Sequence, residues 1–224
     1  MSFIEYLRSP EEVRSPAEDA YDRIKEAILN LSFPPGKKLS EARLAADFEI
    51  GRTPIRSALA RLESENWIRV LPQSGTFVRA LETNELDDLF ELRLLLECQA
   101  SRMATTRITD EQLAGLRILF DELKAKCVEN YIAEFSALDT RFHSTIYRAA
   151  GNRRIEQILL SLQDQIVWVR AQTASAPGRV PESLLEMDKV LAAMEHRDCD
   201  AAQAAMALHI GNIAAAIKSA RADK

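Results

Sequence analysis

Three polar residues in the C-terminal half have the types and surroundings of metal ligands. Asp139 and His143 are four residues apart, so they share one face of a helix, and they lie beside apolar residues such as Phe142. His209 stands four residues before Ile213, again next to an apolar stripe. A carboxylate and imidazoles near a core suit a first-row metal ion. A plain hydrogen bond between Asp139 and His143 explains their spacing as well.

Helices must position these residues. From Ala80 onward the apolar residues recur at helical spacing, and the breaks between runs fall at capping or turn residues. The pattern predicts six helices and no strand, at about 84–105, 109–129, 131–149, 153–172, 181–196 and 200–222. The first of them has a wide apolar face that includes Leu92 and Leu95. This half is therefore expected to be an all-α, bundle-like domain.

The stretch 39–79 predicts two short helices and a hairpin. Ser40 is a suitable N-cap for the first helix. The second follows Gly51 and carries Pro54 in its first turn, where the missing amide does no harm. Two β-rich runs, 67–71 and 76–79, flank a turn that contains Gly75. Helix, turn, helix and hairpin in this order form a winged helix-turn-helix, preceded by a further helix from Pro16.

The charge of this stretch indicates DNA as its partner. Residues 51–79 hold five arginines and two glutamates, whereas the whole chain has a net charge of −5. Arg52, Thr53 and Arg56 lie away from the apolar stripe of the second helix. Arginine can pair with a guanine edge in the major groove, and threonine can reach a base or a phosphate. The alternative is that these are ordinary solvated arginines. Lys37 and Lys38 suit a phosphate contact and a hydrated loop equally well.

The composition is that of a soluble protein of two modest domains. The 224 residues are 47% hydrophobic and 28% charged. No apolar run is long enough to span a membrane, and the start has no secretory signal, so we expect a cytoplasmic protein without a membrane partner. Cys98, Cys127 and Cys199 have no metal-type spacing and are expected to be reduced thiols. Residues 1–15 are expected to form a loose N-terminal arm.

The order of these motifs resembles a family. Residues 16–80 look like the winged-helix domain of GntR-type bacterial transcription regulators. Residues from 83 to 224 resemble the FCD ligand-binding domain of the FadR subfamily. The motifs that carry the resemblance are Pro35-Gly36, Leu39-Ser40-Glu41, Arg52-Thr53-Pro54-Ile55-Arg56, Gly75-Thr76, Glu91-Leu92-Arg93, Asp139-x-x-x-His143, Gly151-Asn152 and Ala207-Leu208-His209-Ile210.

The resemblance implies a homodimeric repressor or activator that binds a palindromic, double-stranded DNA operator. It assigns DNA recognition to Arg52, Thr53 and Arg56 and the wing tip to Gly75, and Arg43 on the preceding helix is expected to join them. It also implies that a small carboxylic acid, bound in the helical domain, alters operator affinity. Arg93 is then a candidate to bind the carboxylate of this effector, because its guanidinium offers a planar fork of donors. The alternative for Arg93 is an ion pair with Glu97, one helical turn away.

Many FCD domains hold Zn or a similar divalent ion, such as Ni or Mn, through one Asp and three His. Asp139, His143 and His209 match three of these ligands, but Met187 stands where the remaining His is expected. Either a three-ligand site remains, or the pocket binds its effector without a metal. A metal-dependent hydrolase that uses the same three residues is the alternative function, and it would leave the winged helix without a role.

Overall fold

The computed structural model describes residues 15–80, 82–125, 132–174 and 179–222. These residues form two compact units, divided between Glu82 and Thr83. The expected N-terminal arm and Cys127 lie outside the described residues, apart from Ser15. Each unit is considered by itself.

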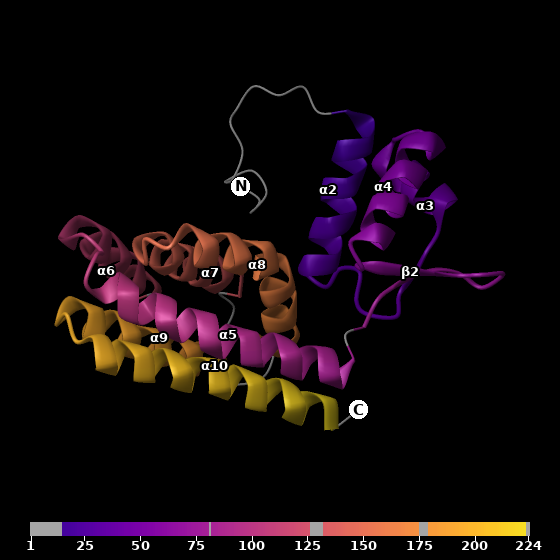
Figure 1. Ribbon diagram of the computed structural model, residues 1–224. Coiled ribbons are helices and arrows are strands. Elements are labelled where there is room, and N and C mark those ends of the chain that lie inside the picture. The colour runs from indigo at the N-terminus through magenta and orange to yellow at the C-terminus, as the bar shows by residue number, and fades with distance from the viewer. Residues whose placement is uncertain (1–14, 81, 126–131, 175–178, 223–224) are drawn as a thin grey trace. The chain divides into compact units, whose positions relative to one another are not determined.

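In its described residues the first unit has three helices and a small antiparallel sheet (Figure 1). Its elements are α2 (Pro16–Leu29), β1 (Lys38–Leu39), α3 (Glu41–Phe48), α4 (Arg52–Ser64), β2 (Ile68–Leu71) and β3 (Gly75–Val78). Helix α2 begins in a capping box, in which Ser15 and Glu18 bind each other's backbone amides. It packs against α4, and Ile24, Ile28 and Ile55 are fully buried between the elements of this unit. Apolar burial of this kind provides the main stabilisation of so small a unit.

The connection between α3 and α4 follows the expected motif. Ser40 caps α3, with its side chain accepting a hydrogen bond from the amide of Arg43. Helix α3 ends at Phe48, and its C-cap residue Glu49 adopts the left-handed conformation at φ 57°. Gly51 is the N-cap residue of α4, so the helix follows Gly51 as the sequence predicted. The tight turn fixes α3 and α4 in the relation that a helix-turn-helix requires.

The sheet has one strand more than the hairpin expected from the sequence. Strand β3 lies in the middle, with β2 on one side and β1 on the other, in the order β1-β3-β2. Strand β1 is only two residues long, and Leu39 pairs with Thr76 while Lys38 pairs with Phe77. So short a strand has no alternating pattern by which it could be recognised. It ties the base of the wing to the segment that leads into α3.

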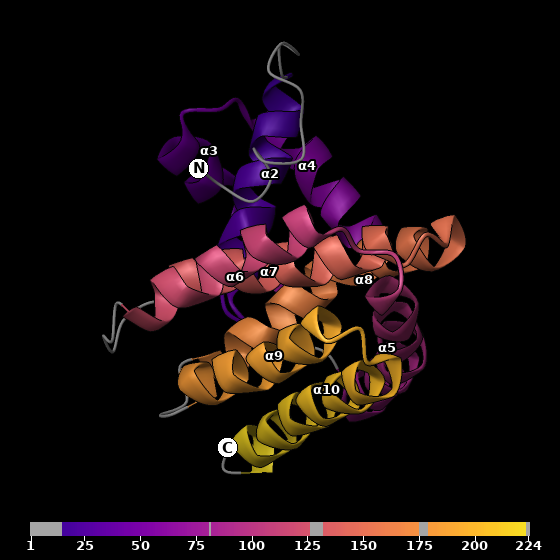
Figure 2. The same ribbon diagram turned by 90° about the vertical axis from the view of Figure 1, so that its left-hand side faces the viewer.

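In the described residues of the second unit every regular element is a helix, and the six helices that the sequence predicted are present. They are α5 (Thr83–Thr105), α6 (Asp110–Ala125), α7 (Ile132–Ala149), α8 (Arg153–Ala174), α9 (Arg179–Glu195) and α10 (Cys199–Ala222). Helices α5 and α10 run side by side along the unit, and α9 packs on α10 (Figures 1 and 2). The predicted fold class, a winged helix followed by an all-α domain, is therefore confirmed.

Helix α5 buries less of its apolar face than its sequence suggested. Leu86, Leu89 and Phe90 are buried, whereas Leu92 is 36% and Leu95 71% exposed. The side chain of Leu95 is therefore largely open to solvent in the described part of this unit. In the part of the chain that the structure describes, no helix is both long and apolar enough to cross a bilayer.

Two glycines should respond in opposite ways to substitution by alanine. Gly115 lies inside α6 with open space around the position of a Cβ atom, so G115A should stabilise the second unit by about 0.5–1 kcal/mol. Gly75 adopts φ +120°, and a Cβ there would lie 2.7 Å from Cε of Lys38. G75A should therefore destabilise the first unit by about 1–2 kcal/mol. Hydrogen exchange measured separately for the two units checks both signs, and a stabilised wing in G75A would contradict this account.

Candidate DNA-binding surface and metal site

The expected DNA-binding residues of α4 all lie on its exposed side. Arg52, Thr53 and Arg56 are exposed, while Ile55 and Leu59 on the opposite side of the helix are buried. The first turn of α4 thus presents two guanidinium groups and a hydroxyl to solvent. Because these side chains are exposed, they are accessible to the major groove of DNA within this unit.

An ion pair between α3 and α4 holds Arg56. Its Nη2 lies 3.0 Å from Oε2 of Glu41, and its Nε donates to Oε1 at 3.3 Å. The hydrogen bond from Arg56 lowers the pKa of the Glu41 carboxyl, and both groups stay ionised at neutral pH. The Arg56 side chain remains 72% exposed, so this pair orients the guanidinium without burying it. Exposed pairs of this kind contribute little to stability.

Arg43 and Gly75 of the wing are the other two positions that the sequence indicated for DNA binding. The side chain of Arg43 is 84% exposed and lies 3.6 Å from Asp47 on the same helix. Gly75 begins strand β3 beside the aliphatic end of Lys38. Lys38 therefore lies against the wing and is itself exposed, whereas Nζ of Lys37 donates to the carbonyl of Ser32 at 3.1 Å.

In the second unit, the structure brings together the three ligand candidates. Asp139 and His143 come from α7 and His209 from α10, and one potential ligand atom of each lies within 4.8 Å of those of the others. All three are buried, with exposures of 3%, 1% and 0%. The two imidazole rings stack with centroids 5.5 Å apart. Asp139 Oδ1 and His143 Nε2 are 3.7 Å apart, beyond hydrogen-bonding distance, so the alternative of a simple Asp–His bond is not formed between these atoms.

Each of the two histidines in this cluster, His143 and His209, has a carboxylate near its Nδ1 atom. Oε2 of Glu186 on α9 lies 2.8 Å from Nδ1 of His209, and Oε2 of Glu97 on α5 lies 2.9 Å from Nδ1 of His143. A histidine that gives Nδ1–H to a carboxylate presents Nε2 as a lone pair, which is the usual arrangement around metal-binding imidazoles. The donor set therefore fits a divalent cation held by Asp139 and two Nε2 atoms.

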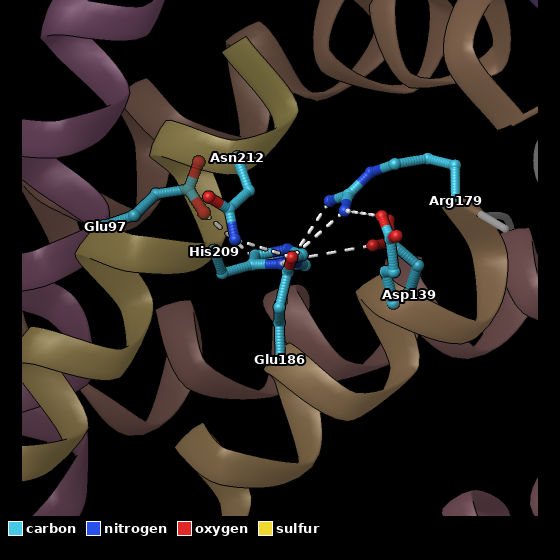
Figure 3. A network of polar contacts seen from close by, with 8 residues as sticks. Glu97, Asp139, Arg179, Glu186, His209 and Asn212 are labelled. Carbon is cyan, nitrogen blue, oxygen red and sulfur yellow. Dashed lines mark hydrogen bonds and ion pairs between the residues drawn. The ribbon is translucent and has the colours of Figure 1, made fainter. Parts of the chain in front are cut away.

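Glu186 is fixed by a network of its own, shown in Figure 3. Arg179 donates to both of its carboxylate oxygens, at 3.0 and 2.9 Å, and Asn212 donates to Oε1 at 2.8 Å. Burial raises the pKa of Glu186, but the hydrogen bonds from His209, Arg179 and Asn212 outweigh burial and lower it to about 2. Glu186 is consequently an anion at neutral pH. Met187, at the position of the expected fourth ligand, is fully buried.

Arg93 lies in the same unit and is 0% exposed. Its Nε donates to Oε1 of Glu97 at 2.6 Å, so the ion pair considered from the sequence is formed. Its two terminal nitrogens, Nη1 and Nη2, have no hydrogen-bond partner among the described residues. Burial lowers the pKa of Arg93, and the charges of Glu97 and Asp139 raise it by more, so the guanidinium stays charged. A buried cation with two unused donors has the chemistry to bind an anion.

Sequence reasoning identified Asp139, His143, His209 and Arg93 but missed four residues around them. These are Glu97 in its contact with His143, and Glu186, Arg179 and Asn212. Each contact joins different helices or distant turns, and no local spacing reveals it. The buried aromatic residues Phe142, Tyr147 and Trp168 belong to the core of this unit.

Comparison with known proteins agrees with this architecture. A family model described as "FCD domain" matches residues 88–212, more than half of the chain, and one described as "Bacterial regulatory proteins, gntR family" matches residues 16–78. The chain belongs to the GntR family and carries an FCD domain. This GntR protein resembles the "Nta operon transcriptional regulator" of Aminobacter aminovorans, with 32% identity over 173 residues that cover 77% of this chain and 82% of the relative.

Solved structures show the same fold. E. coli McbR/YncC aligns with a TM-score of 0.75 and 22% identity, covering 92% of this chain and 99% of its own. The Zn2+-bound FCD domain of TM0439 aligns with a TM-score of 0.53 and 23% identity, over 62% of this chain and 96% of that domain. The resemblance to GntR regulators with an FCD domain is thus confirmed, and this GntR protein is a DNA-binding transcriptional regulator. The hydrolase alternative receives no support from these relatives.

Proposed function

We propose that this GntR protein is a homodimeric, cytoplasmic repressor whose affinity for a palindromic operator is altered by a small carboxylic acid bound in its FCD domain. The single observation that carries the effector part is the buried Arg93 guanidinium, with two terminal nitrogens that have no hydrogen-bond partner among the described residues. Leaving such donors unsatisfied in a core costs free energy. An incoming carboxylate would satisfy both in the bidentate manner that arginine favours.

The DNA-binding residues in this proposal are those on the exposed side of the winged helix. Arg52, Thr53 and Arg56 enter the major groove from α4, Arg43 supports them from α3, and Gly75 lets the wing approach the backbone. The support is their exposure and their position at the start of α4. A dimer would place two such helices on the two half-sites of a palindrome. The exposed Leu95 of α5 supplies apolar surface that a second copy could cover.

A divalent ion, of the Zn, Ni or Mn type, is proposed as the cofactor. Asp139, His143 and His209 would hold it through one carboxylate oxygen and two Nε2 atoms. When bound, the ion would supply a Lewis-acidic centre for the effector carboxylate. Three ligands leave room in the coordination shell for that carboxylate, and the FCD domain of TM0439, which has this fold, is described as Zn2+-bound.

Elemental analysis and thermal shift test this proposal together. Protein purified without chelator or nickel resin should contain about one divalent ion per chain. A panel of small carboxylic acids should then include some that raise the melting temperature, because a ligand present at 100 times its Kd stabilises the native state by about 2.7 kcal/mol.

The matched variant is His143→Ala, which removes one ligand while leaving Arg93 in place. It should lose the metal and reduce the shift that any active acid produces. A metal content near zero, together with effector binding that survives His143→Ala, would remove the ion from the proposal. No shift with any acid, with or without Zn2+, would contradict the effector site itself.

A further inference from the structure

One carboxylate stands between the arginine and one of the histidines of this site. Glu97 is fully buried, and its two oxygens have different partners. Oε1 accepts from Nε of Arg93 at 2.6 Å, and Oε2 lies 2.9 Å from Nδ1 of His143. Glu97 is the fourth residue after Arg93 on α5, whereas His143 comes from α7, so the carboxylate joins two helices.

The chemistry of a carboxylate restricts what both neighbours can do. An ionised carboxylate only accepts hydrogen bonds, so we expect a neutral His143, whose Nδ1 lies 2.9 Å from Oε2 of Glu97, to carry its proton on Nδ1. Its Nε2 then has a lone pair directed toward the side on which Asp139 lies. The opposite tautomer, with a proton on Nε2, could not bind a metal ion through that atom. The same carboxylate accepts from Nε of Arg93 and so restrains the guanidinium, whose Nη1 and Nη2 have no hydrogen-bond partner among the described residues.

We propose that Glu97 is a positioning residue that sets the metal-binding tautomer of His143 and orients the anion-binding edge of Arg93 at the same time. It thus couples the metal and effector halves of one site. The coupling rests on the proposed function, because it presumes that both halves are used. The assignment of the tautomer to Glu97 does not depend on it.

Glu186 provides an internal comparison. It stands in the same relation to His209, but its remaining contacts go to Arg179 and Asn212 rather than to Arg93. Glu186 should therefore set the tautomer of His209 without affecting Arg93. Each carboxylate thus lies at Nδ1 of one histidine, but Glu97 accepts from Arg93 and Glu186 accepts from Arg179.

Glutamine at position 97 makes the two ends of the carboxylate chemically different, because one oxygen is replaced by an NH2 group. In Glu97→Gln only one of the two positions is still an acceptor oxygen, because the other becomes an NH2 donor, and Nε–H of Arg93 requires the acceptor. The amide NH2 then faces Nδ1 of His143, which favours the tautomer with the proton on Nε2. The side chain keeps its size, so packing is conserved. Loss of an outer-shell partner of this kind commonly weakens metal binding by about 10–100-fold.

The test is 15N NMR of histidine-labelled full-length protein, in the apo form at about pH 8, where an ordinary imidazole is neutral. The chain has three histidines, so the spectrum contains three pairs of ring nitrogens. The pair that disappears in His196→Gln belongs to His196. We expect Nδ1–H at both His143 and His209 in the unsubstituted chain. Glu97→Gln should convert only His143 to Nε2–H, and Glu186→Gln should convert only His209. Glu91→Gln, an exposed glutamate on the same helix α5, should change neither.

Metal affinity is measured next, by competition of a chromophoric chelator for Co2+ and Zn2+. Both substitutions should weaken binding by about 10–100-fold, and Glu91→Gln should not. The inference is overturned if the unsubstituted His143 carries its proton on Nε2, or if Glu97→Gln leaves both its tautomer and the metal affinity unchanged. If the unsubstituted chain binds neither ion, the proposed metal fails, while the tautomers still decide the role of Glu97. If a variant does not fold, the spectrum of the unsubstituted chain still shows which nitrogen of His143 carries the proton and so tests the role of Glu97.

Discussion

Alanine at both Arg52 and Arg56 should weaken binding to the operator by about 2–6 kcal/mol. Each arginine that pairs with a base edge contributes about 1–3 kcal/mol of discrimination, and both are exposed at the start of α4. The loss should be larger for the operator than for unrelated DNA, because base contacts and not only phosphate contacts are removed. Gel-shift titration against a duplex selected from a random pool, and against an unrelated duplex of the same length, measures both affinities.

The control is Arg153→Ala/Arg154→Ala, which removes the same two charges from exposed positions on α8 in the FCD domain. It should leave the operator affinity and the salt dependence of binding almost unchanged. The single variant Arg56→Ala also releases Glu41 from its ion pair, so its effect is compared with that of Arg56→Ala/Glu41→Ala. An operator affinity and a salt slope that are unchanged in Arg52→Ala/Arg56→Ala would contradict the proposed DNA-binding surface.

Methionine in place of Arg93 should destabilise the FCD domain by about 3–5 kcal/mol. The substitution leaves Glu97 buried without its cationic partner, and breaking a buried ion pair from one side has a cost of this size. It should also abolish stabilisation by carboxylic acids, because the two terminal nitrogens of the guanidinium are removed. Denaturant unfolding of the FCD domain gives the first effect, and thermal shift with an active acid gives the second.

The double substitution Arg93→Met/Glu97→Met distinguishes stability from binding. Replacing both members of a buried pair with apolar residues of similar size is often neutral or stabilising, so part of the lost stability should return, although His143 loses the carboxylate at its Nδ1 atom. Binding of the acid should not return with it. Acid binding in the double variant equal to that of the unsubstituted protein would show that Arg93 does not contact the effector.

The sequence predicted those parts of the fold that local rules specify. The cap at Ser40, the start of α4 directly after Gly51 and Pro54 in the first turn of α4 are consequences of helix geometry, and the structure has all of them where expected. Strand β1 was missed because pairing of Lys38 and Leu39 with β3 depends on a distant partner. The exposure of Leu95 was missed as well, because periodicity identifies an apolar face but not what covers it.

In the candidate site, too, the contacts within one helix could be predicted and those between helices could not. The spacing of Asp139 and His143, and the i,i+4 pair of Arg93 with Glu97, are properties of single helices and could be read from the sequence. The contact of Glu97 with His143 joins residues 46 positions apart, so only the packing of α5 against α7 reveals it. Glu186 escaped notice for the same reason, although it directly precedes Met187.

The chain has two tryptophans, and each unit holds one of them. Trp67 is 6% exposed in the winged unit, where Nζ of Lys25 lies 5.2 Å from its ring centroid, and Trp168 is 3% exposed on α8 of the FCD domain. Since a chain of two domains need not unfold in a single transition, an optical signal that mixes both domains is ambiguous. Phenylalanine at either tryptophan position would leave one indole emitter, whose spectrum follows a single domain while the other binds DNA or acid.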